Sequence, residues 1–130
     1  MGIALSQKKS GSGRPVVAVV GDGALQYSIQ SLYTAAQLKL KLIYIVPCNG
    51  EYAILKEFAV LEKTPNVPAL DVPGLDIVST AKGFGCIAVL AKTAEEIKEA
   101  FTTALGAEGP TVIAIPIAHQ LRPLVPSAAD

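Results

Sequence analysis

Two short polar segments of this 130-residue chain carry residue types that could hold a metal ion. Asp22 lies in Gly21-Asp22-Gly23, directly after the apolar run Val16–Val20, and Asn49 follows a second apolar run, Leu42–Val46. A carboxylate, an amide oxygen and a nearby backbone carbonyl are hard oxygen ligands, which Mg²⁺ and Ca²⁺ prefer. Mg²⁺ usually keeps further positions for water and phosphate oxygens. If the two apolar runs are neighbouring strands, the pattern predicts a site for a metal-bridged diphosphate.

Both segments are also common turn sequences. Gly-Asp-Gly and Asn-Gly recur in turns because glycine adopts positive φ angles, and because Asp and Asn side chains bond to their own backbone. The same glycines would let the backbone approach a ligand closely. The residues alone therefore leave two interpretations open, a pair of ordinary turns and a metal–diphosphate site.

The segments around these polar residues alternate between two hydrophobic patterns. Continuous apolar runs are typical of buried strands, which we expect at Val16–Val20, Leu42–Val46, Cys86–Leu90 and Thr111–Ile115. Apolar residues at helical spacing predict helices over Ser28–Leu38 and Tyr52–Leu61. Asp76 is a candidate N-cap for a short helix ending near Gly83 or Gly85. A capping box of Thr93 and Glu96 predicts a last helix, which ends at Gly106.

This alternation predicts an α/β fold, a parallel β-sheet with helices on both faces in three α/β/α layers. Ligands of such folds bind at the carboxyl ends of the strands, where both polar segments fall. We expect residues 1–15 to be a flexible N-terminal segment, because residues 10–13 are only Ser and Gly. Residues 16–118 form the α/β domain and residues 119–130 a tail. Within the domain, the Pro-rich stretch Thr64–Leu75 is expected to be an irregular loop.

The composition excludes several classes of protein. Lys+Arg and Asp+Glu both number 11, and there is no basic stripe of the kind that nucleic-acid-binding proteins carry. The apolar runs are far shorter than the roughly 20 residues of a membrane span, so no membrane partner is expected. The N-terminus lacks the residue order of a secretory signal peptide. Cys48 and Cys86 have neither disulfide-framework nor metal-type spacing, so we expect packed, unreactive thiols and a cytoplasmic location.

The chain is also unusually apolar for its size. Hydrophobic residues make up 51% of it and charged residues only 17%, against about 25% in a typical domain. A small domain leaves much of its surface in water. We therefore expect some of this surface to be hidden against another domain or another copy of the chain, as a homo-oligomer. A sheet buried on both faces would also use apolar residues.

The two polar segments together resemble the thiamine-diphosphate-binding motif. Further on, residues 66–76 (NVPALDVPGLD) and 81–85 (AKGFG) resemble the benzoylformate decarboxylases within the thiamine-diphosphate-dependent enzymes. The resemblance covers residues 16–115. It implies the C-terminal, pyrophosphate-binding domain of a longer 2-keto acid decarboxylase, which uses thiamine diphosphate and Mg²⁺ (or Ca²⁺).

The resemblance also implies roles for particular residues. Asp22 and Asn49 would bind the metal through their side chains, and Glu51 through its backbone carbonyl. The residues placed against the cofactor are Gly21, Asp22, Gly23, Ala24, Tyr27, Asn49, Glu51 and Tyr52. Leu55 and Phe58 match positions that line the substrate pocket, with ordinary core packing as the alternative.

Three features depart from the family pattern. Cys48 stands where the family usually has a first Asn, and Ala24 where it often has Ser. Ser6–Gly13 is shorter and more polar than the family's helix before the first strand, and the glycine-rich turn ahead of that helix is missing. The family's activating glutamate lies on a separate pyrimidine-binding domain, the expected partner. We predict no catalytic residue in this chain, with His119 as a surface residue, and hence no turnover by the chain alone.

Three functional hypotheses follow. The leading one is that the chain anchors the cofactor diphosphate through a divalent metal, as a domain of a benzoylformate-type decarboxylase; acetolactate-synthase-like substrates fit the same motif. The second is a non-catalytic remnant or interaction module that keeps the fold, which Ala24 and Cys48 favour. The third is an α/β domain that binds a different phosphate ligand. Metal-dependent binding of thiamine diphosphate separates the first from the other two.

Overall fold

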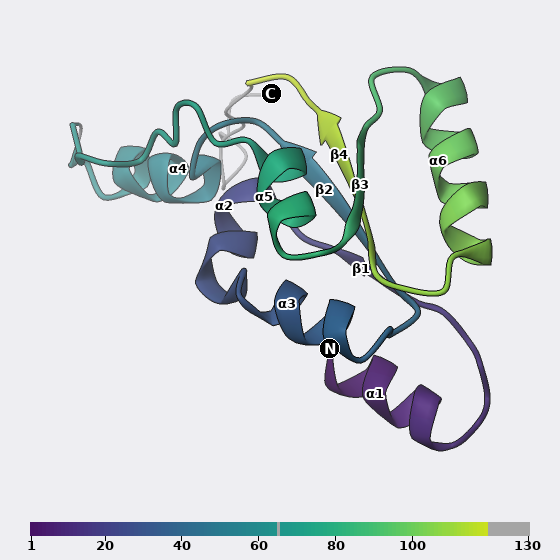
Figure 1. Ribbon diagram of the computed structural model, residues 1–130. Coiled ribbons are helices and arrows are strands. Elements are labelled where there is room, and N and C mark those ends of the chain that lie inside the picture. The colour runs from purple at the N-terminus through teal and green to yellow at the C-terminus, as the bar shows by residue number, and fades with distance from the viewer. Residues whose placement is uncertain (65, 120–130) are drawn as a thin grey trace, which may run out of the picture.

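The sheet of this protein is parallel and four-stranded, in the order β1-β2-β4-β3. The structure is a computed structural model and describes residues 1–64 and 66–119. Its strands are β1 (Val16–Val19), β2 (Leu42–Cys48), β3 (Ile87–Leu90) and β4 (Thr111–Pro116). Its helices are α1 (Gly2–Lys9), α2 (Asp22–Leu25), the 3₁₀-helix η1 (Gln26–Ser28), α3 (Ser31–Gln37), α4 (Ala53–Leu61), α5 (Ile77–Gly83) and α6 (Ala94–Gly106). The predicted α/β fold with a parallel sheet is confirmed (Figure 1).

Helices cover both faces of the sheet, which gives the predicted three layers. On one face, Ala4 of α1, Leu32 of α3 and Ala81 of α5 pack in a single cluster with alternate residues of the strands, such as Tyr44 and Val112. On the other face, α6 packs against the opposite set of strand residues, which includes Ile43 and Ile113 (Figure 1). Burial on both sides explains the continuous apolar runs of the central strands β2 and β4. The edge strands β1 and β3 are also apolar throughout, but residues such as Val19 and Ile87 are exposed on one face.

The strands match the predicted runs, and the largest difference lies at the end of β2. Val19 of β1 pairs with Ile45, but β2 continues to Cys48 because its last residues pair with β4, from Val46 opposite Ala114 to Cys48 opposite Pro116. The chain therefore reaches Asn49 directly from a strand that has a hydrogen-bonded neighbour up to its final residue. The position of Asn49 relative to Asp22 is therefore set by the pairing of β2 with β4.

The helix predicted over Ser28–Leu38 begins earlier and is interrupted. Asp22 already lies in the first turn of α2, and η1 separates α2 from α3. Gly21 takes an extended conformation directly before α2, so only Val20 and Gly21 separate β1 from the helix. The expected turn around Gly23 is thus part of a helix, which places the Asp22 carboxylate at the helix N-terminus, where a negative charge is favourable.

Most of residues 1–15, which we expected to be flexible, form a helix in the structure. Gly2–Lys9 forms α1, and the Ala4 side chain is buried in the same cluster as α3 and α5. Lys8 donates a hydrogen bond from its ammonium group to the Leu38 carbonyl. These contacts are tertiary, so a segment with little helical pattern of its own forms a helix because of what it packs against.

Both predicted helix caps are confirmed. The Asp76 carboxylate accepts a hydrogen bond from the Ser79 amide at 2.9 Å and caps α5. Thr93 and Glu96 form the capping box of α6, in which each side chain accepts from the other residue's backbone amide. The pKa of Glu96 is lowered because the Lys92 and Thr93 amides donate to its carboxylate. Residues 62–64 and 66–76, between α4 and α5, form no helix or strand, as expected from the prolines of this stretch.

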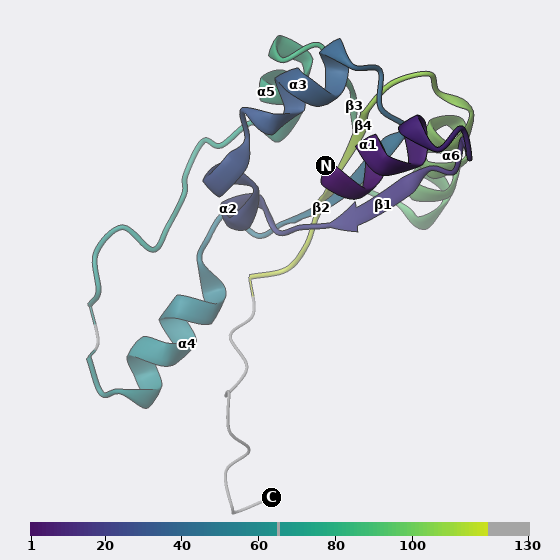
Figure 2. The ribbon, with the colours of Figure 1, turned by 90° about the horizontal axis from the view of Figure 1, so that it is seen from below.

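Large apolar side chains remain exposed over several elements, including Val19 of β1, Phe58 of α4 and Ile87 of β3. α4 stands apart from the sheet (Figure 2). Within the described part of the chain, α4 contributes no buried residue. No helix among residues 1–64 and 66–119 is long and apolar enough to cross a bilayer. The described residues thus leave much of the apolar composition on the surface.

Candidate functional site

The buried carboxylate of Asp22 joins the ends of β1 and β2. Its side chain accepts a hydrogen bond from its neighbour, the Gly23 amide, at 2.8 Å through Oδ1. Its other oxygen, Oδ2, accepts from the Gly50 amide at 2.8 Å, across the gap between the two strand ends. Asp22 is only 4% exposed. Two backbone amides thus hold an ionisable group that is rarely buried without partners, and they fix where both of its oxygens lie.

The turn after β2 presents Asn49 beside this carboxylate. The Asn49 Oδ1 accepts a hydrogen bond from the Glu51 amide at 3.2 Å, which closes a tight turn. Gly50 has a φ of 69°, a conformation that favours glycine because it has no Cβ. Before the turn, the Cys48 carbonyl accepts from the Ile117 amide at 3.0 Å, so the chain that follows β4 also holds the end of β2.

Aromatic residues form the wall next to Asp22. The Tyr52 hydroxyl donates to the Gly23 carbonyl at 3.4 Å, and the Tyr52 ring lies 6.4 Å from the Tyr27 ring, centre to centre. A Cβ atom on Gly23 would lie 2.6 Å from Cε1 of Tyr52, closer than such contacts occur. Glycine at position 23 is therefore needed for the close approach of Tyr52 to α2.

The structure brings the predicted site residues together in one cleft of about 270 Å³. The predicted residues that line it are Gly21, Asp22, Gly23, Ala24, Tyr27, Asn49, Glu51, Tyr52 and Leu55. Phe58 is the predicted residue that does not line it; it lies further along α4 and is 48% exposed. The alternative of ordinary core packing is wrong for Leu55 and Phe58, since neither side chain is buried within the described chain. Their place in a substrate pocket stays a prediction.

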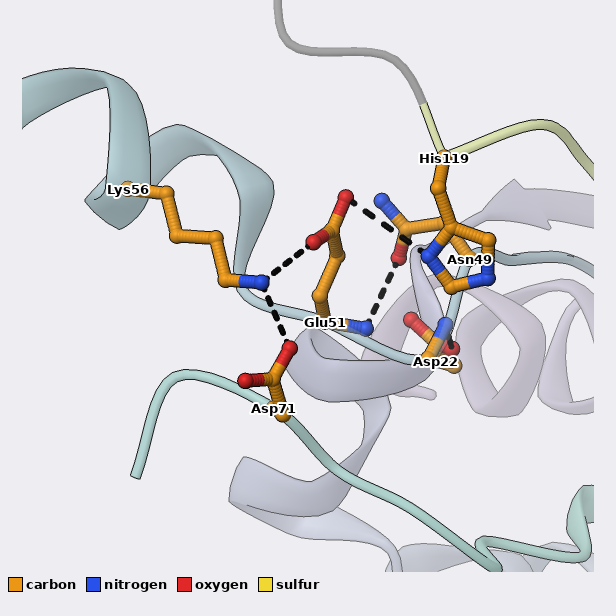
Figure 3. Close-up of polar contacts among 7 residues, drawn as sticks. Asp22, Asn49, Glu51, Lys56, Asp71 and His119 are labelled. Carbon is orange, nitrogen blue, oxygen red and sulfur yellow. Dashed lines mark hydrogen bonds and ion pairs between the residues drawn. The ribbon is translucent and has the colours of Figure 1, made fainter. Parts of the chain in front are cut away.

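The sequence reasoning missed two charged residues beside the cleft. Lys56 of α4 places its ammonium group 2.5 Å from a carboxylate oxygen of Glu51 and 2.5 Å from one of Asp71 (Figure 3). Asp71 lies in the loop before α5, where it forms an isolated antiparallel bridge with Glu51. Lys56 belongs to no motif, and Asp71 lies within the 66–76 segment that carries the family resemblance, where it was given no role. His119 is exposed, as predicted, with its Nδ1 3.9 Å from Oε1 of Glu51.

Neither cysteine forms a disulfide among the described residues. Burial raises the pKa of the Cys86 thiol to about 11. The pKa of Cys48 is also raised, first by burial and then by the negative charge of Asp22. Both thiols are therefore protonated and weakly nucleophilic at neutral pH, in line with the expectation of packed, unreactive cysteines.

The donors in the cleft fit a hard divalent cation. Among residues 1–64 and 66–119, no group of three or more His, Cys, Asp and Glu side chains is placed to hold a metal. The predicted set is of another kind, with one carboxylate, one amide oxygen and one backbone carbonyl. Such a set leaves positions for phosphate oxygens and water, which is the coordination that Mg²⁺ prefers.

Comparisons with known proteins agree with this geometry. Residues 1–115 match the family described as "Thiamine pyrophosphate enzyme, C-terminal TPP binding domain". Benzoylformate decarboxylase from Pseudomonas aeruginosa is 41% identical over 103 residues, which are 79% of this chain and 20% of that protein. The chain thus spans about a fifth of the length of this curated relative.

Two solved structures extend the comparison. The crystal structure of benzoylformate decarboxylase from Polynucleobacter necessarius superposes with a TM-score of 0.91 at 50% identity, over 95% of this chain and 23% of that one. A putative thiamin diphosphate-dependent enzyme from Mycobacterium smegmatis gives a TM-score of 0.79 at 45% identity, over 92% of this chain and 21% of that one. The resemblance inferred from the Asp22 and Asn49 segments is confirmed. The chain belongs to the C-terminal, thiamine-pyrophosphate-binding domain family of the thiamine pyrophosphate enzymes.

Proposed function

We propose that this chain binds the diphosphate of thiamine diphosphate through a divalent metal ion, Mg²⁺ or Ca²⁺. In this proposal the side chains of Asp22 and Asn49 and the backbone carbonyl of Glu51 hold the metal. The observation that carries it is the 2.8 Å hydrogen bond between the Asp22 carboxylate and the Gly50 amide. It joins the start of α2 to the Asn49 turn, two segments that are distant in sequence and whose carboxylate and amide side chains line the same cleft.

The residues of this chain would bind and orient the cofactor rather than react with the substrate. Asp22 is held by two backbone amides before any ligand binds, so its oxygens need no rearrangement to accept a cation. Tyr27, Tyr52 and Leu55 give the same cleft an apolar wall. When bound, thiamine diphosphate supplies the nucleophilic carbon and the electron sink for decarboxylation of a 2-keto acid.

The activity of the whole protein is part of this proposal. By analogy with the benzoylformate decarboxylases it resembles, we infer that the chain serves as one domain of a decarboxylase for 2-keto acids, working in the cytoplasm. A pyrimidine-binding domain, as partner, would supply the groups that activate the cofactor. The chain spans only about a fifth of its curated relatives, so we expect it to bind cofactor without turning over substrate by itself.

Calorimetric titration of the purified chain with thiamine diphosphate tests the proposal. In the presence of Mg²⁺ we expect saturable binding, which EDTA abolishes and added Ca²⁺ restores. The metal dependence follows because diphosphate and the Asp22 carboxylate are both anionic and repel each other without a cation between them. A folded chain, as judged by circular dichroism, that binds no thiamine diphosphate would favour the non-catalytic module instead. Binding of other diphosphates with equal affinity would favour a different phosphate ligand.

Self-association is the second expected result. Exposed apolar side chains such as Val19, Phe58 and Val60 would lose contact with water in a dimer or a larger oligomer. We expect sedimentation velocity to show dimers or larger species whose fraction rises with protein concentration. A chain that sediments as a monomer at the highest attainable concentration would contradict this expectation.

A further inference from the structure

The carboxylate of Glu51 has no part in the proposed metal site, which uses only the Glu51 backbone carbonyl. Its side chain is nevertheless 7% exposed and lies beside the Asn49 turn. A buried carboxylate without a partner is strongly destabilising, so something must compensate its charge. His119 does not do so by a hydrogen bond, because its Nδ1 lies 3.9 Å from Oε1 of Glu51.

Lys56 is the residue that compensates it. Its ammonium group donates to Oε2 of Glu51 at 2.5 Å, the only short cation contact of this carboxylate within residues 1–64 and 66–119. Lys56 lies near the N-terminus of α4, where the helix dipole disfavours a positive charge. The helix therefore does not explain the position of this cation, whereas the Glu51 carboxylate does.

The same ammonium group also reaches the loop before α5. It donates to Oδ1 of Asp71 at 2.5 Å, and the backbone on either side of the Glu51–Asp71 bridge is paired as well. The Tyr52 amide donates to the Leu70 carbonyl at 2.8 Å, and the Val72 amide donates to the Gly50 carbonyl at 2.9 Å. Both carboxylates, Asp71 first, raise the pKa of Lys56, so it is charged at neutral pH.

The two ion pairs of Lys56 contribute differently to stability. The Asp71 side chain is 74% exposed, and an ion pair in water contributes little. The Glu51 carboxylate is largely buried, so loss of Lys56 would leave a charge that water contacts only slightly. The carboxylate would then turn outward to water, and the backbone of the Asn49–Glu51 turn would move with it.

We propose that Lys56 is a positioning residue for the cofactor site, which keeps the Glu51 carboxylate buried and so fixes the Asn49–Glu51 turn and the first turn of α4. Figure 3 shows Lys56 reaching from α4 to both carboxylates, with Asn49 and Asp22 on the far side of Glu51. The proposal rests on the metal site of the preceding subsection for its functional meaning. Its structural content, a turn held by Lys56, stands independently of any cofactor.

Hydrogen exchange of the metal-free chain tests the structural content. In Lys56→Met we expect the Tyr52 and Val72 amides to exchange at least about tenfold faster than in the unmodified chain. The amides of Ile45 and Ile113 in the central strands serve as internal references, and their protection should not change. Lys56→Arg keeps the charge and should keep the protection. Equal exchange of the Tyr52 and Val72 amides in Lys56→Met and the unmodified chain would overturn the proposal.

A double variant tests whether Glu51 carries the effect. Lys56→Met with Glu51→Gln leaves no buried charge without a partner, and removing both members of such a pair is often nearly neutral. We therefore expect exchange closer to the unmodified chain than in Lys56→Met alone. Exchange as fast as in the single variant would refute the role of Glu51. Asp71→Asn should change the rates less than about threefold, because that contact is exposed.

Titration with thiamine diphosphate and Mg²⁺ then tests the functional meaning. We expect Lys56→Met to weaken binding by about tenfold or more, and Lys56→Arg to restore it to within about threefold. Unchanged affinity in Lys56→Met, with faster exchange at Tyr52, would overturn the role in the cofactor site. If the unmodified chain binds no cofactor, the metal-site proposal fails, and the exchange rates still decide whether Lys56 holds the turn.

Discussion

Asp22→Asn is expected to reduce the Mg²⁺-dependent affinity for thiamine diphosphate by at least about a hundredfold, or about 2.7 kcal/mol. The substitution removes the only charge among the proposed metal donors. It also places an NH₂ group where Asp22 now accepts hydrogen bonds from the Gly23 and Gly50 amides, so one of these amides would face another donor. Isothermal titration calorimetry at fixed Mg²⁺ measures the effect.

A matched control separates this site effect from a general loss of charge. Glu108→Gln removes one carboxylate from the exposed loop before β4, at the opposite ends of the strands, and should leave the affinity unchanged within about twofold. Asn49→Ala, which removes the amide ligand but leaves Asp22 in place, should weaken binding as well. An Asp22→Asn chain that keeps its thermal stability and binds as tightly as the unmodified chain would show that the metal lies elsewhere.

Gly23→Ala is expected to destabilise the fold by about 1–3 kcal/mol, the usual cost of forcing an extra methyl group into a packed place. The new Cβ would lie 2.6 Å from Cε1 and 2.9 Å from Cδ1 of Tyr52, so the ring must move. The hydrogen bond from the Tyr52 hydroxyl to the Gly23 carbonyl would be lost with it. Urea unfolding followed by circular dichroism gives the change in free energy.

Two further variants show whether the clash with Tyr52 is the cause. Gly21→Ala adds the same methyl group two residues earlier, where nothing lies within 4 Å of the new Cβ, and should change the free energy of unfolding little. Tyr52→Ala should remove most of the penalty of Gly23→Ala, since the ring that blocks the methyl group is gone. Strictly additive effects of Gly23→Ala and Tyr52→Ala in this cycle would rule out the clash.

Much of the fold is predictable here because its signals are local. A strand buried on both faces needs a run of apolar residues, so β2 and β4 can be recognised from the sequence alone. The caps at Asp76 and Thr93 use residues within one turn of each other. α1 was missed because its formation depends on Ala4 packing against distant helices. The early start of α2 was missed because Gly-Asp-Gly is typical of a turn.

Some residues of the candidate site could also be predicted from the sequence, and others could not. Asp22 and Asn49 each follow a strand, and a parallel sheet brings such positions to one edge, so their proximity was predictable. Lys56 and Asp71 meet because the chain before α5 forms a bridge with Glu51, and no pattern of residues encodes that contact. The role of Phe58 in a substrate pocket stays a prediction, because its side chain is exposed in this chain.

The order of the strands has a consequence for synthesis on the ribosome. β2, which leads into the Asn49 turn, is paired on one side by β1 and on the other by β4, the last strand among the described residues. The Ile117 amide then holds the Cys48 carbonyl, one residue before Asn49. A nascent chain in which β4 is still inside the ribosome therefore contains the whole binding motif, but β2 is paired only with β1. The cleft, which Ile117 lines, is completed only when the chain after β4 has emerged. If the proposed function holds, the domain would bind its cofactor only after β4 has been synthesised.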